Sequence, residues 1–271
     1  MNDMVRNIVG DSKKFFHIWW VLTAQSTQTA LASKLGASLF ISGKILRFVF
    51  FLLFLIIVLS KTNIVAGYTL WQMVLFYATF NLIDTMTQFF LREVYRFRGY
   101  VISGNFDYML TKPLSPLLRS LFGGSDILDL IPLFSLLFFI GYITLHLSGV
   151  TLLSICIYAL LVINAFLIAL SFHIFVIALG VITTEVDNAI WMFREMTQLG
   201  RVPIEIYREP LSFVLTFVLP VAIMVTFPAR ALMGTLSFQW VLIAFFFSGL
   251  FLFLSYRFWQ YALKQYASAS S

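Results

Sequence analysis

The sequence predicts an all-α membrane protein whose chain crosses the bilayer in six helices. Of its 271 residues, 61% are hydrophobic and 11% are charged, whereas soluble domains carry about 25% charged residues. Several apolar runs are long enough to cross a hydrocarbon core of about 30 Å, and lysine and arginine gather in the segments on one side of them. We expect a single transmembrane domain over 1–271, with a cytoplasmic or interfacial helix at 1–38, the bundle at 39–259 and a cytoplasmic tail at 260–271.

The segment at about 13–35 is too polar to span the bilayer. Phe15, Ile18, Trp19 and Leu22 recur at the i, i+3, i+4, i+7 spacing of one helical face. This pattern predicts an amphipathic helix in the membrane interface, with tryptophan at headgroup depth. Packing of the same face on another subunit is a compatible alternative.

Five apolar segments read as spans. They lie at about 40–60, 68–91, 126–146, 151–182 and 239–258. The fourth is longer than the hydrocarbon core requires, so it either protrudes from the bilayer or contains a break.

The remaining span has two candidates. One is 211–227, which leaves the charged segment 184–210 in the cytosol. The other is 184–200; the proline-broken segment 203–230 then forms a re-entrant hairpin on the outer side, which is tolerated where protein or water covers its backbone. Both arrangements keep the carboxyl-terminal tail inside.

The distribution of basic residues fixes the expected orientation. Outside the spans, the amino-terminal segment, the long loop at 92–125, the segment 184–210 and the tail hold most of the lysines and arginines, whereas the other side keeps only Lys61 and Arg230. This bias predicts that both termini lie in the cytoplasm. We expect the protein to span the inner (plasma) membrane of the cell. The net charge of +6 therefore reports orientation rather than a nucleic-acid partner.

Motifs for chemistry within this chain are missing from the sequence. It contains no G-x-x-x-x-G-K-[ST] and no H-E-x-x-H, so we expect no nucleotide site and no enzymatic activity. His17, His146 and His173 are far apart, and Cys156 is the single cysteine; we expect no metal site. Uphill transport would take its energy from an ion gradient or from a separate ATPase.

One polar stripe interrupts the second span. Its members, at i, i+3, i+4 and i+7, are Asn81, Asp84, Thr85 and Gln88. Polar residues at this depth face protein or water, so the stripe is a candidate lining of a translocation path; the alternative is hydrogen bonding between helices. Asp84 is also a candidate proton-coupling carboxylate, without an evident partner in the other spans. Lys44 and Arg47 are expected to snorkel to the interface.

The loop after the second span contains turn signals around a short helix. Gly104 suits the end of one helix, and Asn105 can cap a helix that ends at about Thr111, before Pro113. Ser115 caps the next helix. The first of these helices would present apolar side chains beyond the membrane: Phe106, Tyr108, Met109 and Leu110. Such a surface favours docking of a partner protein; a helix lying on the bilayer is the alternative.

These residues resemble the membrane-spanning permease of ABC-2 type exporters. The resemblance lies in the G-x-x-D-x-x-L-x-K-P-L pattern from Gly104 to Leu114, in the late segment at 201–234, and in the order of the predicted spans. It implies a second permease copy or a sister permease, and a separate cytosolic ATPase that holds ATP and magnesium, with no cofactor in this chain. The residues implied in ATPase docking are Gly104, Asn105, Phe106, Asp107, Tyr108, Leu110, Lys112 and Pro113.

The resemblance also favours 184–200 as the fifth span. That segment is polar, with Asp187, Arg194 and Glu195 among its residues, and we interpret these charges as a lining that faces the dimer axis. The phenylalanine-rich composition suits a hydrophobic or amphipathic cargo. Two other hypotheses are a gradient-driven carrier that uses Asp84 and a membrane enzyme acting on lipids, which would need a catalytic cluster at one interface.

Overall fold

The computed structural model describes residues 2–62, 64–112, 114–183 and 186–266, with side chains from residue 16 onward. These residues form helices and short helical turns without a β-strand, so the all-α prediction is confirmed for them. The long helices are α1 (Asn2–Ala32), α2 (Lys34–Thr62), α3 (Leu70–Leu91), α7 (Leu130–Thr144), α8 (Leu152–Thr183) and α12 (Phe238–Gln265).

Shorter elements connect them. Between α3 and α7 lie η1 (Arg92–Arg96), α4 (Phe97–Ile102), α5 (Asn105–Thr111), α6 (Pro116–Phe122) and η2 (Ile127–Asp129). Between α8 and α12 lie α9 (Val186–Gln198), η3 (Leu199–Arg201), η4 (Ile204–Ile206), α10 (Leu211–Phe213), η5 (Val214–Val218), η6 (Ala222–Thr226) and α11 (Phe227–Leu232).

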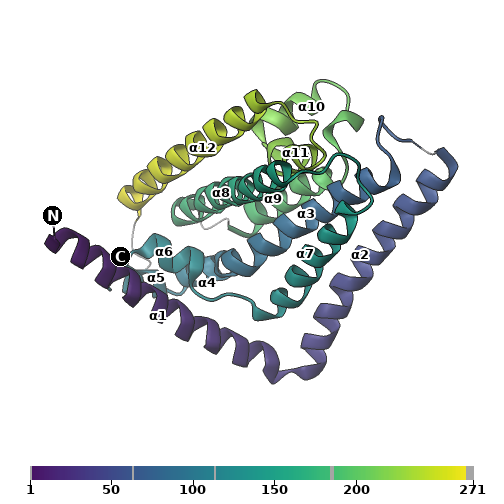
Figure 1. Cartoon of the computed structure of the whole chain (residues 1–271). Coiled ribbons are helices and arrows are strands. Elements are labelled where there is room, and N and C mark those ends of the chain that lie inside the picture. The colour runs from purple at the N-terminus through teal and green to yellow at the C-terminus, as the bar shows by residue number, and fades with distance from the viewer. Residues whose placement is uncertain (1, 63, 113, 184–185, 267–271) are drawn as a thin grey trace.

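Helices α3 and α8 form the centre of the bundle. Helix α12 packs along α8, and α7 packs along α3. Helix α2 lies at the outside of the bundle, and α1 crosses the end of the bundle where α4, α5 and α6 lie (Figure 1). The largest apolar core joins α3, α7, α8 and the late segment of the chain.

Among the described residues, four elements are each long and apolar enough to cross a membrane: α2, η2 with α7, α8 and α12. Helix α3 is not among them, because its polar stripe lowers its hydropathy. It is nevertheless a helix of 22 residues, most of them buried by its neighbours. The surrounding helices thus allow a polar helix to occupy the centre of the bundle.

Helix α8 is continuous over 32 residues, so the apolar run contains no break. Its last turns pack against α4 and α9. The tight contact is at Gly180, where the chain leaves room for Phe97 and Val186.

The segment after α8 runs back along the bundle. At its start, Asp187 pairs with Arg98 of α4 at 3.5 Å. At its end, Glu205 pairs with Arg230 at 3.2 Å and lies beside Tyr68 in the loop between α2 and α3. Burial and the Glu205 carboxylate raise the pKa of Tyr68 to about 12. Residues 186–206 therefore connect the two ends of the bundle.

The following segment folds into a bent pair. Residues Leu211–Val218 and Ala222–Leu232 meet at 74°, with Pro220 at the break. This geometry fits a broken span, as in the first predicted arrangement, and a re-entrant hairpin, as in the second, so the choice of the fifth span stays a prediction. Helix α9 has only 13 residues, about 20 Å, and η3 and η4 follow it.

Helix α1 confirms the predicted amphipathic helix but not the position of its apolar face. Ile18, Trp19 and Leu22 lie against α6, and Trp19 Nε1 donates to Ser125 Oγ at 3.2 Å. The loop between α3 and α7 therefore covers part of this face, and the predicted position of the helix in the membrane interface stays a prediction. A different stripe, with Phe16 62% exposed, remains free.

The α8–α9 contact gives a first testable prediction. A methyl group on Gly180 would overlap the Val186 side chain, and overpacking costs about 1–3 kcal/mol. We expect Gly180→Ala to lower the melting temperature of the detergent-purified protein. The matched control is Gly141→Ala in α7, where the methyl group meets nothing within 4 Å; equal melting temperatures for the two variants would contradict this packing.

Candidate functional site

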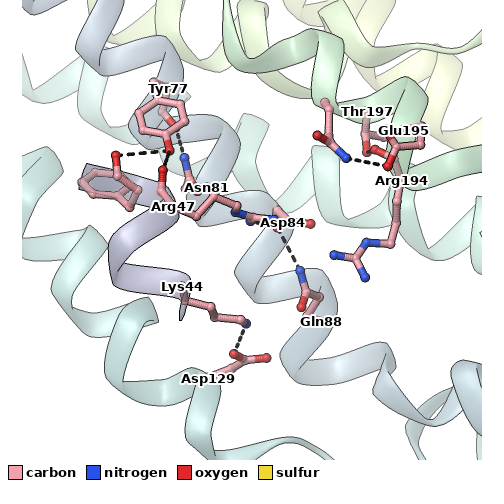
Figure 2. Close-up of polar contacts among 12 residues, drawn as sticks. Lys44, Arg47, Tyr77, Asn81, Asp84, Gln88, Asp129, Arg194, Glu195 and Thr197 are labelled. Atoms are coloured by element: carbon pink, nitrogen blue, oxygen red, sulfur yellow. Dashed lines mark hydrogen bonds and ion pairs between the residues drawn. The ribbon is translucent and has the colours of Figure 1, made fainter. Parts of the chain in front are cut away.

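The predicted polar stripe lies on α3, and most of it is buried in the bundle (Figure 2). Asn81, Thr85 and Gln88 are 7%, 6% and 4% exposed, and the Asp84 side chain is 19% exposed. Asn81 Nδ2 donates to the Tyr77 carbonyl at 2.7 Å, so this amide is satisfied within its own helix. The stripe faces protein rather than lipid, which both predicted roles require.

Asp84 is paired with an arginine from α2. Arg47 Nη2 lies 3.3 Å from Asp84 Oδ2, and Gln88 Nε2 donates to the same oxygen at 2.8 Å. The prediction that Asp84 has no partner in another span is wrong, because α2 packs against α3 and holds Arg47 at the depth of the carboxylate. The pair offsets part of the cost of two charges at this depth.

A second ion pair joins α2 to the start of α7. Lys44 Nζ bonds to Asp129 Oδ1, whose side chain is 0% exposed. Lys44 and Arg47 thus each pair with a carboxylate of a neighbouring element, and their expected snorkelling to the interface stays a prediction. Asp126 caps η2, since its Oδ1 accepts from Leu128 N at 3.2 Å.

An open cavity of about 320 Å³ lies between α2, α3 and α7, beside these ion pairs. Its polar side chains are Lys44, Arg47, Asn81, Asp84, Thr85 and Ser135. The rest of its wall is mainly isoleucine, leucine and phenylalanine from α2 and α7. An apolar enclosure with a few convergent polar groups is typical of a binding site.

Two further arginines lie on the α9 side of α3. Arg201 lies over the rings of Phe51 and Phe80, 5.6 Å from each centroid, and Arg194 lies over Tyr95 at 5.9 Å. Neither forms an ion pair with a residue that the structure describes. Arg194 is among the residues predicted from the sequence, but Arg201 is not. Arg201 directly follows the predicted span 184–200, a position typical of a loop residue.

The segment between α3 and α7 is organised around Glu93, which is 1% exposed. Its Oε1 accepts from Arg119 Nη1 at 2.8 Å and from Tyr100 OH at 2.7 Å, and its Oε2 accepts from Arg96 Nη1 at 3.1 Å. Burial and the hydrogen bond to Glu93 raise the pKa of Tyr100. Arg96 also reaches Ser26 of α1 at 3.5 Å. We call these five residues the Glu93 cluster.

The sequence analysis did not identify Glu93. The available signal is that it is the one carboxylate within the basic run 92–98. Its burial depends on α1 and α6 closing over it, which no local pattern predicts.

Helix α5 is the predicted short helix, and it ends at Thr111 as expected. The sequence predicts Asn105 as its cap; the structure places Gly104 there, with φ of 72°. Asn105 is instead the first helical residue, and its Nδ2 donates to Ser103 Oγ at 2.8 Å. The prediction is wrong because glycine adopts the left-handed conformation of this turn at little cost.

Phe106 does not project from α5. It is 0% exposed, and its ring meets those of Phe97, Trp259 and Tyr266 at centroid distances of 5.3, 6.3 and 5.1 Å. The prediction of an exposed Phe106 is wrong because α12 extends far enough to pack against α5. Phe106 therefore anchors the helix to the bundle.

The outer surface of α5 consists of other predicted residues. Tyr108 and Leu110 are 68% and 38% exposed, and Lys112 is exposed beyond the helix. Asp107 is half-buried in the first turn. Pro113 lies outside the described residues.

Comparison with known proteins identifies the family. The model of the ABC-2 family transporter proteins matches residues 45–270, and the chain therefore belongs to this family. A search of curated proteins found no match. The chain is an ABC-2 type permease, the membrane component of an ABC transporter, and its family implies an ATP-binding partner.

The Glu93 cluster gives a prediction about stability. Glu93→Gln removes a buried charge that holds Arg96 and Arg119, and hydrogen bonds to charged groups contribute about 1.5–3 kcal/mol each. We expect the melting temperature of the purified protein to fall by several degrees. The control is Asp187→Asn, which removes the half-exposed carboxylate of an ion pair with Arg98; exposed pairs contribute about 0–1 kcal/mol. Similar melting temperatures for both variants would show that the cluster does not stabilise the fold.

Proposed function

We propose that this permease belongs to an exporter and docks on a separate cytosolic ATPase through α5. The observation that carries the proposal is the shape of this helix. Its inner side is fixed to α12 by Phe106, while its outer side leaves Tyr108 68% exposed. An aromatic side chain held outward by a rigid support is suited to insertion into a partner's groove.

The elements behind α5 support transmission of motion into the membrane. Glu93 lies directly after α3 in the chain, and its carboxylate holds Arg119 of α6. Phe106 connects α5 to α12. A displacement of α5 by the ATPase therefore acts on α3 and α12 together, and α3 carries the polar stripe.

We further propose six spans with both termini in the cytosol of an inner (plasma) membrane. The spans are α2, α3, η2 with α7, α8, residues 186–206 and α12, and the bent pair after Pro210 lies as a re-entrant hairpin on the outer side. The concentration of lysine and arginine at the α5 end supports this orientation.

The assembly is proposed to contain two permeases, as a homodimer or with a sister subunit. Helix α9 supports this, since it leaves Trp191 and Met192 58% and 64% exposed. ATP and magnesium bind the ATPase rather than this chain. The polar stripe lines the path of a hydrophobic or amphipathic cargo.

A gradient-driven carrier is the second candidate function. The Arg47–Asp84 and Lys44–Asp129 pairs favour it, because coupled carriers place acids and bases within the membrane. Purification in mild detergent, with mass spectrometry and an ATPase assay on the eluate, separates the two. A co-purifying nucleotide-binding subunit with ATP turnover supports the exporter; a single polypeptide without ATPase supports the carrier.

A substitution on α5 tests the docking surface. Tyr108→Asp places a charge on the exposed side of the helix, so we expect an unchanged melting temperature and about tenfold less ATPase retained on the purified permease. Phe106→Asp should instead lower the melting temperature, because its side chain is buried.

The control for this test is Leu145→Asp, which changes an 80% exposed side chain at the other end of the bundle. It should retain the ATPase at the normal yield. Normal retention by Tyr108→Asp would refute docking through this side of α5.

The proposed orientation can be checked by cysteine labelling in a Cys156→Ser background. Tyr108→Cys and Leu145→Cys introduce thiols at exposed positions near opposite ends of the bundle. We expect a membrane-impermeant maleimide to label position 145 in intact cells or right-side-out vesicles and position 108 only in inverted vesicles. The reverse pattern would contradict the orientation.

A further inference from the structure

We propose that Arg47, Arg194 and Arg201 bind an oxyanionic group, phosphate or carboxylate, of the transported molecule as it passes the polar stripe. This inference rests on the proposed transport function and specifies its substrate class. The first observation is an excess of positive over negative side chains around α3.

The three arginines come from separate elements and lie near the same part of α3. Arg47 lies on α2, Arg194 on α9 and Arg201 on η3. Arg201 lies over Phe51 and Phe80, which are one helical turn from Arg47 on α2 and from Asp84 on α3. Figure 2 shows the Arg194 side chain extending toward the part of α3 that carries Asp84 and Gln88.

The negative charges in this region do not neutralise the arginines. Asp84 pairs with Arg47 alone. Glu195 also acts on Arg201, but it accepts from Gln198 Nε2 at 3.0 Å and forms no ion pair among the described residues. Uncompensated cations at membrane depth are costly and mark substrate or ion paths.

The arginines without ion pairs are available to an anion. Arg201 is stacked on Phe51 and Phe80, which occupies the face of its guanidinium and leaves the N–H groups at its edge for other partners. Those N–H groups form a planar fork that matches phosphate or carboxylate with two parallel hydrogen bonds. Stacking also restricts the side chain, which lowers the entropic cost of binding.

Arg47 and Asp84 complete the site. Arg47 is 42% exposed in its side chain and lines the apolar-walled cavity beside α3, where the apolar part of a cargo can lie. Its bond to Asp84 is the longer of that oxygen's two bonds, at 3.3 Å against 2.8 Å from Gln88. An incoming oxyanion can therefore take Arg47 while Gln88 still satisfies Asp84.

This arrangement predicts opposite effects for the two kinds of charge. Removal of an arginine weakens binding of an anion, whereas removal of the Asp84 charge strengthens it, because Asp84 competes for Arg47. A purely structural role of the cluster would make both substitutions weaken binding.

The experiment is calorimetric titration of the full-length permease in a neutral maltoside detergent, without the ATPase. The probes are octyl phosphate, octyltrimethylammonium and inorganic phosphate. We expect octyl phosphate to bind and octyltrimethylammonium not to bind. Arg201→Gln and Arg47→Gln should each weaken octyl phosphate binding about tenfold, and Asp84→Asn should tighten it.

Two further variants act as controls. Arg257→Gln removes an exposed arginine on α12 and should leave affinity unchanged, which excludes a general effect of net charge. Arg201→Lys keeps the positive charge but loses the planar fork of N–H groups, so it should bind octyl phosphate with intermediate affinity. It replaces Arg201→Gln in the test if the glutamine variant does not fold.

The outcomes identify the anion's source or overturn the inference. Preference for octyl phosphate over inorganic phosphate indicates an amphiphile, and equal binding indicates a free anion. Equal binding of both octyl probes, or weaker binding in Asp84→Asn, refutes the inference. If octyl phosphate binds as expected but the purified permease retains no ATPase, the proposed exporter is contradicted and the anion site is not. The reason is that this titration does not involve the ATPase.

Discussion

The fold depends on one constraint: charges carried to membrane depth must find partners inside the protein, because lipid offers none. Helix α2 is mostly exposed along its apolar length, and two of its basic residues pair with carboxylates of neighbouring elements. Lys44 bonds to Asp129 and Arg47 to Asp84. These pairs fix the rotation of α2 about its axis, and they keep a polar face on α3 that would otherwise be costly.

A second buried carboxylate performs the same task outside the membrane. Glu93 takes hydrogen bonds from η1, α4 and α6, so three short elements with little core of their own become one support for α5. Short helices are marginal when isolated, and their order here comes from this tertiary cluster and from Phe106. The docking surface is therefore rigid where it meets the bundle and free where it meets a partner.

The two functional surfaces are joined by a single stretch of chain. Helix α3 carries the polar stripe, and η1 continues directly into the Glu93 cluster. Membership of the ABC-2 transporter family fits this connection, because in the proposed exporter ATP is hydrolysed on a separate subunit and its energy must reach the membrane mechanically. The arginines around Asp84 lie at the membrane end of this connection, where a cargo would pass.

The sequence by itself determined the class, the helical spans with clear apolar runs, the polar stripe from Asn81 to Gln88 and the short helix at α5. These features depend on composition, on i, i+3, i+4 spacing and on turn residues, which are local. The tertiary structure alone decided which charges are paired, that Glu93 is buried and that Phe106 faces inward. Those outcomes depend on α2 meeting α3, on α1 closing over α6 and on α12 reaching α5, and such contacts join residues far apart in the chain, where periodicity carries no information.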